Sequence, residues 1–211
     1  SGEPIEDCLV RWVKKYNARG CAGMFKKWVY DENRKPYGSW GNGAAMRISP
    51  VGFLPEDELY KFKAITNCTH NCKESLEAAE IVTNMIHELY YDENISKSDL
   101  DMYLSGTSYY KTLSHTLEEI RPTYGFHVEC QESVPQSILC FLESENYEDC
   151  LKLAISMGGD ADTMACIAGS IAYPYYREIP EKLLNFAIDK LDEDIFDVVC
   201  KFDEFIWKKN I

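Results

Sequence analysis

Residues 76–89 read Leu76-Glu77-Ala78-Ala79-Glu80-Ile81-Val82-Thr83-Asn84-Met85-Ile86-His87-Glu88-Leu89. Apolar residues recur in this stretch at spacings of three and four, which places them on one face of an α-helix. The members of this face are Leu76, Ala79, Val82, Ile86 and Leu89. The stretch therefore predicts an amphipathic helix, and outward from it the same period returns towards both ends of the chain.

The helical period is repeated near the N-terminus and twice near the C-terminus. The apolar positions there are Ile5, Leu9, Trp12, Val13 and Tyr16, then Leu183, Leu184, Ala187, Ile188 and Leu191, and then Ile195, Val198, Val199, Phe202 and Ile206. No run alternates polar and apolar residues for long enough to predict a strand, and no Gly/Ser-rich linker divides the chain. The sequence predicts an all-α fold, with residues 1–211 forming a single compact multi-helix domain.

Several local signals predict where helices begin and end. Ser96-Lys97-Ser98-Asp99 fits a capping box at the start of a helix. Pro135 and Pro180 are predicted to be first helical residues, a position that proline favours. Pro174 is predicted to end or kink its helix, because its ring removes a backbone donor and clashes with the preceding turn.

The composition excludes several classes of protein. The chain carries 22 Lys and Arg against 35 Asp and Glu, a formal net charge of −13. This charge opposes binding to nucleic acid and to anionic lipid, so neither a nucleic acid nor a membrane is expected as a partner. No apolar run approaches the ~20 residues of a membrane-spanning helix. An acidic start without a signal-peptide core and nine irregularly spaced cysteines favour a reduced, cytoplasmic protein.

A glycine-rich segment interrupts the helical pattern at Gly38-Ser39-Trp40-Gly41-Asn42-Gly43. Glycines let a ligand approach the main chain closely, and a loop that runs into a helix start offers backbone N–H groups to an anion such as phosphate. The following Ala44-Ala45-Met46 is compatible with such a helix. An ordinary turn with Asn42-Gly43 at its corner fits the spacing equally well, since the segment matches neither the Walker nor the dinucleotide pattern.

A second glycine-rich segment brings two carboxylates and a hydroxyl together, in Gly158-Gly159-Asp160-Ala161-Asp162-Thr163. One aspartate would suffice to cap the helix predicted to follow, so capping does not explain both. A divalent cation would offset the repulsion of crowded carboxylates, and oxygen donors suit Mg²⁺ or Ca²⁺ better than zinc. Asp160, Asp162 and Thr163 are therefore candidate metal ligands.

His70 lies in Cys68-Thr69-His70-Asn71-Cys72, just before the predicted helix of residues 76–89. A zinc site is disfavoured, because the spacing is tight and a partner pair of ligands is missing. An imidazole N–H at this position could contact a phosphate, while a purely structural histidine is an equally good interpretation.

Four segments together resemble the ADP-ribosylglycohydrolase family, the all-helical fold of the dinitrogenase-reductase-activating glycohydrolase and the ADP-ribosylhydrolases. They are residues 38–47, Thr69-His70, Glu132-Ser133-Val134-Pro135 and residues 158–163, and they occur in the family's order. The resemblance implies a hydrolase that removes ADP-ribose from modified protein side chains with the help of two Mg²⁺ ions. ADP-ribose or an ADP-ribosylated protein would be the partner.

The resemblance also implies roles for individual residues. Asp160, Asp162 and Thr163 would bind metal, and His70 would donate to phosphate. The residues of the glycine segment would hold the diphosphate and a neighbouring ribose; these are Gly38, Ser39, Trp40, Gly41, Asn42 and Gly43. No catalytic residue is assigned with certainty in this chain.

One departure from the family pattern concerns the remaining metal ligands, which come from an N-terminal Thr-Asp-Asp-Thr motif. The chain has no such motif, and the segment from Ile5 resembles the helices that follow it. We therefore expect an N-terminally shortened fold, at most one Mg²⁺ at the aspartate cluster, and a missing segment or complementing chain as a further partner.

Three functional interpretations follow from the sequence. The first is a Mg²⁺-dependent ADP-ribosylglycohydrolase, present as a fragment or short form whose activity alone is doubtful. The alternative is a non-catalytic ADP-ribose or nucleotide binder, and the third is a helical scaffold whose glycine loops are only turns.

Overall fold

The computed structural model describes residues 2–209, which form thirteen α-helices and one short 3-10 helix. In chain order these are α1 (Ile5–Lys15), α2 (Gly23–Tyr30), α3 (Ser49–Gly52), the 3-10 helix η1 (Glu56–Glu58), α4 (Lys61–Asn67), α5 (Lys73–Tyr91), α6 (Lys97–Leu104), α7 (Tyr110–Leu113), α8 (Leu117–Ile120), α9 (Cys130–Glu143), α10 (Tyr147–Ser156), α11 (Ala161–Tyr176), α12 (Glu181–Ile188) and α13 (Glu193–Lys209). No strand occurs in the described part of the chain, apart from an isolated bridge between Gly41 and Glu129. The predicted all-α fold is confirmed.

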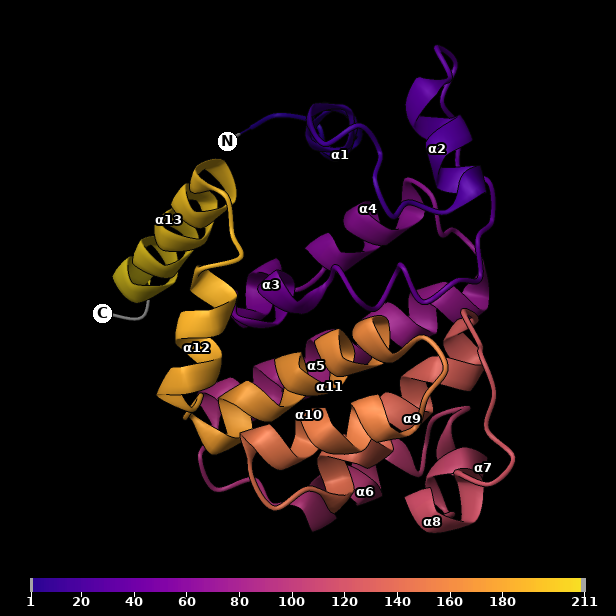
Figure 1. Cartoon of the computed structure of the whole chain (residues 1–211), viewed down its shortest axis with the longest axis vertical. Coiled ribbons are helices and arrows are strands. Elements are labelled where there is room, and N and C mark those ends of the chain that lie inside the picture. The colour runs from indigo at the N-terminus through magenta and orange to yellow at the C-terminus, as the bar shows by residue number, and fades with distance from the viewer. Residues whose placement is uncertain (1, 210–211) are drawn as a thin grey trace.

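The main core is built around α11, which packs against α5, α9 and α10 (Figure 1). Its Met164, Ile167, Ala168, Ile171 and Ala172 are buried on the side that faces these helices. The predicted helix of residues 76–89 is α5, and Ala79, Val82, Ile86 and Leu89 of its apolar face are buried. Burial of these side chains supplies the main driving force for folding, at about 25 cal/mol per Å² of apolar surface.

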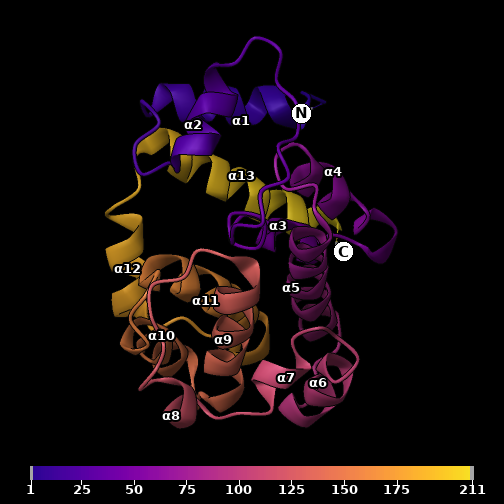
Figure 2. The same cartoon turned by 90° about the vertical axis from the view of Figure 1, so that its right-hand side faces the viewer.

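A smaller apolar cluster joins the N-terminal helices to the start of the core. Val10 of α1, Trp28 and Val29 of α2, and Cys68 beyond α4 are its buried members. Figure 2 shows α1 and α2 stacked at one end of the molecule, with α13 running beneath them. Tyr16 at the end of α1 donates a hydrogen bond to Asp192 Oδ1 (2.6 Å), and Lys15 pairs with Asp194 at the start of α13.

The C-terminal helices form as predicted, but their apolar residues are largely exposed. No residue of α12 is buried, and Leu184 and Ile188 of its predicted apolar face are exposed. In α13 the apolar face is buried only towards its end, where Ile206 joins the main core.

The prediction for Pro135 is wrong, α11 does not end at Pro174, and the prediction for Pro180 is displaced by one residue. Pro135 lies within α9, six residues after Glu129, which occupies the N-cap position. Pro174 lies within α11, which continues to Tyr176 and ends at Arg177 in the left-handed conformation (φ 55°). Both prolines are buried among core helices, so packing offsets the lost backbone hydrogen bond. Pro180 is the residue before the first helical residue of α12.

The capping box predicted at Ser96 is confirmed, with reciprocal bonds between Ser96 and Asp99. All nine cysteines are free thiols. Cys140 and Cys150 are buried among apolar side chains as free cysteines commonly are, whereas Cys166 and Cys200 are exposed. Within residues 2–209, every helix is too short or too polar to cross a membrane.

Gly52 is the position where α3 lies closest to α5, and it gives the first testable prediction. A Cβ at residue 52 would lie 2.5 Å from Ile86 Cγ2 and 3.0 Å from the Thr83 carbonyl oxygen. Gly52→Ala should therefore lower the free energy of unfolding by about 1–3 kcal/mol, measured by chemical denaturation. Gly23→Ala on α2, where a Cβ meets open space, is the matched control and should cost nothing. Equal stability of the two variants would contradict this packing.

Candidate functional site

The glycine-rich segment forms a loop between α2 and α3 that other segments hold in place. The amide of Gly38 donates to Asn71 Oδ1 (2.8 Å), and that of Ser39 donates to the Thr69 carbonyl (3.2 Å). The amide of Asn42 donates to the Val128 carbonyl (2.7 Å). Gly38 has φ 63°, a left-handed value that favours glycine. The loop is therefore a fixed feature of the fold.

The backbone donors that the loop could offer to an anion are fewer than the sequence predicts. The Gly41 amide already donates to Ser39 Oγ (3.2 Å), in addition to the three amides described above. Among the described residues, the amides of Trp40 and Gly43 are the loop donors left without a protein acceptor. A phosphate bound here would find two backbone N–H groups.

The helix expected directly after the loop begins later. Residues 42–47 form turns, in which the Met46 amide donates to the Asn42 carbonyl (3.0 Å), and α3 starts only at Ser49. Pro50 occupies the first turn of α3, where its missing N–H is tolerated. The four-residue α3 contributes no N-terminal anion site to the loop.

The predicted metal cluster lies at the start of α11. Gly158 and Gly159 have φ values of 77° and 64°, and a Cβ at Gly159 would lie 2.8 Å from the Gly125 carbonyl oxygen. Asp160 occupies the N-cap position, but its side chain makes no capping bond, so the capping interpretation is wrong for it. Asp162 is exposed, and its Oδ1 accepts from the Thr163 amide (2.9 Å).

One hydrogen bond joins the two glycine-rich segments, which are 118 residues apart in the sequence. Asn42 Nδ2 donates to Asp160 Oδ2 at 2.7 Å, and Asn42 is buried. A second contact lies beside it, where Thr163 Oγ1 is 3.9 Å from Met46 Sδ. The structure thus places the predicted phosphate loop and the predicted metal ligands next to each other.

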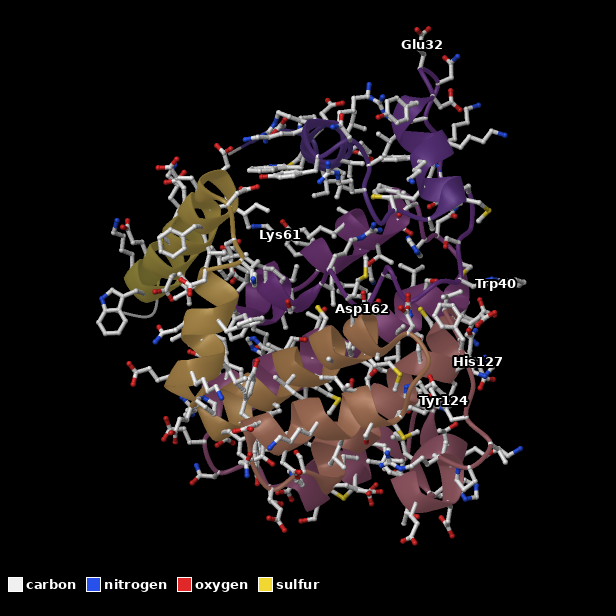
Figure 3. The ribbon with its side chains drawn as sticks, viewed as in Figure 1. Glu32, Trp40, Lys61, Tyr124, His127 and Asp162 are labelled. Carbon is white, nitrogen blue, oxygen red and sulfur yellow. The ribbon has the colours of Figure 1, made fainter. Side chains whose placement is uncertain are left out.

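A third segment, residues 122–129, lies against both glycine-rich segments, and the sequence prediction missed it. Val128 accepts from the loop, the Cys130 amide donates to the Trp40 carbonyl (2.9 Å), and Gly125 contacts Gly159. Figure 3 shows Trp40 at the edge of the molecule with Tyr124 and His127 close by, and Asp162 across from them. The missed signal was an aromatic, glycine-containing stretch without helical period, Tyr124-Gly125-Phe126-His127-Val128.

Aromatic side chains project from the rim of this site. Trp40 and Phe126 are 64% and 72% exposed, which is high for side chains of this size. Nearby, Tyr124 donates from its hydroxyl to the Glu132 carbonyl (3.0 Å). Burial, together with the negative charges of Glu132, Asp160 and Glu129, raises the pKa of Tyr124 above its usual value.

His70 is buried beneath the loop. Its Nδ1 lies 2.7 Å from Thr69 Oγ1 and 3.1 Å from Arg47 Nη2. Burial and the positive charge of Arg47 lower the pKa of His70 to about 3, so the ring is neutral near pH 7. Because this value lies below the unfolded one, protonation favours the unfolded chain as the pH falls below about 6.5.

The predicted metal ligands match a hard divalent cation in kind but do not complete a coordination shell. Asp160, Asp162 and Thr163 offer only oxygen donors, and Mg²⁺ takes about six. No group of three or more His, Cys, Asp or Glu side chains suited to a metal occurs among the described residues. Two further carboxylates, those of Asp31 and Glu32, lie away from this cluster. Asp31 accepts from the Asn33 amide in a turn, and Figure 3 shows Glu32 at the far tip of the molecule.

A hollow of about 440 Å³ lies at the other end of α11 and contains none of these residues. Its lining includes Asp92, Ser96, Pro174 and Arg177. The candidate site is therefore defined by its polar groups and not by the volume of a cavity.

Comparison with known proteins identifies the family of the chain. A model of the ADP-ribosylglycohydrolase family matches residues 3–201, so the chain belongs to this family. ADP-ribosylhydrolase ARH3 from Bos taurus is 26% identical over 220 residues, covering 82% of this chain and 60% of the relative, and ARH3 from Homo sapiens gives the same values. ADP-ribosylarginine hydrolase Tri1 from Pseudomonas putida (strain GB-1) is 23% identical over 194 residues, covering 78% of this chain and 48% of the relative.

A solved structure described as an ADP-ribosylglycohydrolase-related protein complex has a similar fold. The TM-score is 0.61 at 22% sequence identity, and the match covers 87% of this chain and 68% of that chain. The chain spans about 60% of the length of the ARH3 relatives named above.

The bond between Asn42 and Asp160 gives the second prediction. Asn42→Ala removes the donor and leaves the half-buried Asp160 carboxylate without it, so the free energy of unfolding should fall by about 1–2 kcal/mol. Chemical denaturation measures the loss, with Asn185→Ala on the exposed α12 as the matched control. A loss no larger than that of the control would show that the two segments are held together by other contacts.

Proposed function

We propose that this chain binds ADP-ribose at the site between the glycine loop and the start of α11, and that it acts in the Mg²⁺-dependent removal of ADP-ribose from modified proteins. The observation that carries the proposal is the bond from Asn42 Nδ2 to Asp160 Oδ2, because it sets the candidate phosphate donors beside the candidate metal ligands. Membership of the ADP-ribosylglycohydrolase family supports the same activity.

Each part of the site has a task in this proposal. The amides of Trp40 and Gly43 and the ring of His70 would donate to the diphosphate. The exposed indole of Trp40 would cover an aromatic or sugar ring of the ligand. By fixing the diphosphate, these groups would hold the ribose and its anomeric carbon at one position relative to α11.

Asp160, Asp162 and Thr163 would hold the metal, which when bound orients ribose hydroxyls and lowers the pKa of a water. Asn42 would orient the Asp160 carboxylate by its hydrogen bond, leaving the other carboxylate oxygen for the cation. With three protein oxygens, we expect at most one Mg²⁺ at this cluster, weakly bound, and slow or no turnover unless further ligands are supplied by an upstream segment or a complementing chain.

The second candidate function is an ADP-ribose binder without catalysis, which the short ligand set favours. Isothermal titration with ADP-ribose and hydrolysis of an ADP-ribosylated peptide, each with and without Mg²⁺, separate the two. Binding with Mg²⁺-dependent release of ADP-ribose supports the hydrolase, binding without release supports the binder, and no binding rejects both.

The third prediction concerns the loop. A side chain at residue 41 would meet Ser39 Oγ at 3.3 Å and face His70 Nε2 at 3.8 Å, on the side where the ligand is proposed to bind. Gly41→Val should therefore abolish ADP-ribose binding in calorimetry while the melting temperature changes little. Gly23→Val on α2 is the control and should bind normally. If Gly41→Val still binds ADP-ribose, the loop is only a structural turn.

The fourth prediction concerns the metal. Asp162→Asn keeps the size of an exposed side chain and removes its charge, so Mg²⁺ affinity should fall at least tenfold with no loss of stability. Asp101→Asn, an exposed aspartate on α6, should leave Mg²⁺ affinity unchanged. Equal Mg²⁺ binding by both variants would place the cation elsewhere.

A further inference from the structure

His70 is held by two groups that both approach the same ring nitrogen. Arg47 Nη2 lies 3.1 Å from Nδ1, and Thr69 Oγ1 lies 2.7 Å from it. Arg47 Nη2 also donates to Thr69 Oγ1 at 2.5 Å. A guanidinium group has only donors and stays charged in proteins, so in its contact with His70 it can only donate.

The protonation of the ring follows from this contact. Because Nδ1 faces a group that can only donate, the contact favours an accepting Nδ1, and a neutral imidazole then carries its hydrogen on Nε2. The Thr69 hydroxyl fits the same pattern, since it accepts from Arg47 and can direct its own hydrogen to Nδ1. The opposite tautomer would set the Nδ1 hydrogen against those of Arg47.

The Nε2 atom points at the inner side of the glycine loop. A Cβ at Gly43 would lie 3.2 Å from Nε2, and one at Gly41 would lie 3.8 Å from it. His70 is only 5% exposed, and within residues 2–209 no protein acceptor lies on Nε2. Among the described residues, Nε2 is not one of the fully buried polar atoms that lack a partner, so it keeps access to solvent and its hydrogen can meet a ligand acceptor at the loop.

We propose that Arg47 is a positioning residue that fixes His70 as an Nε2–H donor aimed into the glycine loop, where the ring donates to an oxygen of a diphosphate ligand. The ligand class rests on the proposed function, whereas the tautomer rests on the contacts of His70 alone. The hydrogen-bond partners of the Arg47 side chain are the Ile65 carbonyl, Thr69 and His70, so Arg47 acts through His70.

The surroundings of the ring keep it neutral. The groups that face it are Arg47, Thr69 and Tyr37, whose ring centre lies 6.3 Å from that of His70, with the Cys68 thiol 3.9 Å from Thr69 Oγ1. Burial raises the pKa of Tyr37 and of Cys68, so neither supplies a negative charge near pH 7. The donated hydrogen bond should therefore keep its strength across the neutral range.

The tautomer can be measured without any ligand. In ¹⁵N-histidine-labelled protein, we expect His70 Nδ1 to resonate as an unprotonated ring nitrogen and Nε2 as a protonated one, with His70→Gln identifying the signals. In Arg47→Met, the two nitrogens should shift towards the averaged values of an unrestrained imidazole. Arg177→Met is the matched control, because Arg177 also donates to backbone carbonyls but lies at the other end of α11. A hydrogen on Nδ1 in the wild-type protein, or an unchanged tautomer in Arg47→Met, would overturn the proposal.

Calorimetry with ADP-ribose tests the consequence, as the fifth prediction. In the wild-type protein, the contribution of His70 to the affinity for ADP-ribose should be constant between pH 6 and 8.5. Arg47→Met should bind about five- to tenfold more weakly throughout this pH range, because burial still keeps the ring neutral while the hydrogen is on Nε2 only part of the time. Arg47→Lys, which keeps the charge, should lie between the two.

Controls separate positioning from a merely structural role and from failure of the proposed function. In a His70→Gln background, Arg47→Met should cause no further loss of affinity, because the positioned ring is gone. An equal loss of affinity with and without His70 would make Arg47 a structural residue and overturn the proposal. If wild-type protein does not bind ADP-ribose, the proposed function fails, while the NMR result still decides whether Arg47 fixes the tautomer.

Discussion

The packing of α11 is the constraint on which the rest of the structure depends. One side of this helix is buried against α5, α9 and α10, so its axis and rotation are fixed by the core. Its first turn carries Asp162 and Thr163, and its N-cap is Asp160. The two glycines before it allow the chain to turn sharply and to pass within contact of Gly125. The position of the acidic cluster is thus set by apolar burial elsewhere in the same helix.

The glycine loop depends on this arrangement in turn. It has no regular structure of its own, so its geometry comes from bonds to Asn71, Thr69, Val128 and Asp160. These bonds consume most of the donors that the loop could offer to an anion. In the proposed function, a loop fixed in this way would bind without the entropic cost of ordering itself, but a larger share of the binding would fall to His70 and to the rim aromatics.

The sequence predicted the helices well because apolar period is a local property of the chain. Residues 76–89 and the C-terminal segments formed helices where the period indicated them. The exposure of α12 could not be predicted in this way. A hydrophobic period shows which residues share a helix face, but it does not show whether another element covers that face. Pro135 was misplaced, and α11 continues past Pro174, for a related reason: packing on neighbouring helices outweighs the local penalty of a proline.

The glycine motifs located the candidate site, but not the contacts that build it. Asn42 and Asp160 are joined across 118 residues of sequence, and residues 122–129 have no hydrophobic period that would predict their place beside the site. Arg47 lies in the turns that follow the loop, and its relation to His70 appears only once α4 has brought Thr69 beside it. Such relations depend on tertiary packing and could not be inferred from spacing.

The electrostatics of the site explain why its two halves would need each other. The chain has a net charge of −13, and Glu129, Glu132 and Asp160 together act on Tyr124 at the rim. An anionic diphosphate entering this region meets repulsion that two backbone amides and one neutral imidazole offset only in part. A cation held by Asp160, Asp162 and Thr163 would reverse the local sign, which makes ADP-ribose and Mg²⁺ affinities interdependent in the proposed function. Because the three oxygens supply about half of the ligands that Mg²⁺ takes, the bound diphosphate and the cation would each complete a site that the other leaves unfinished.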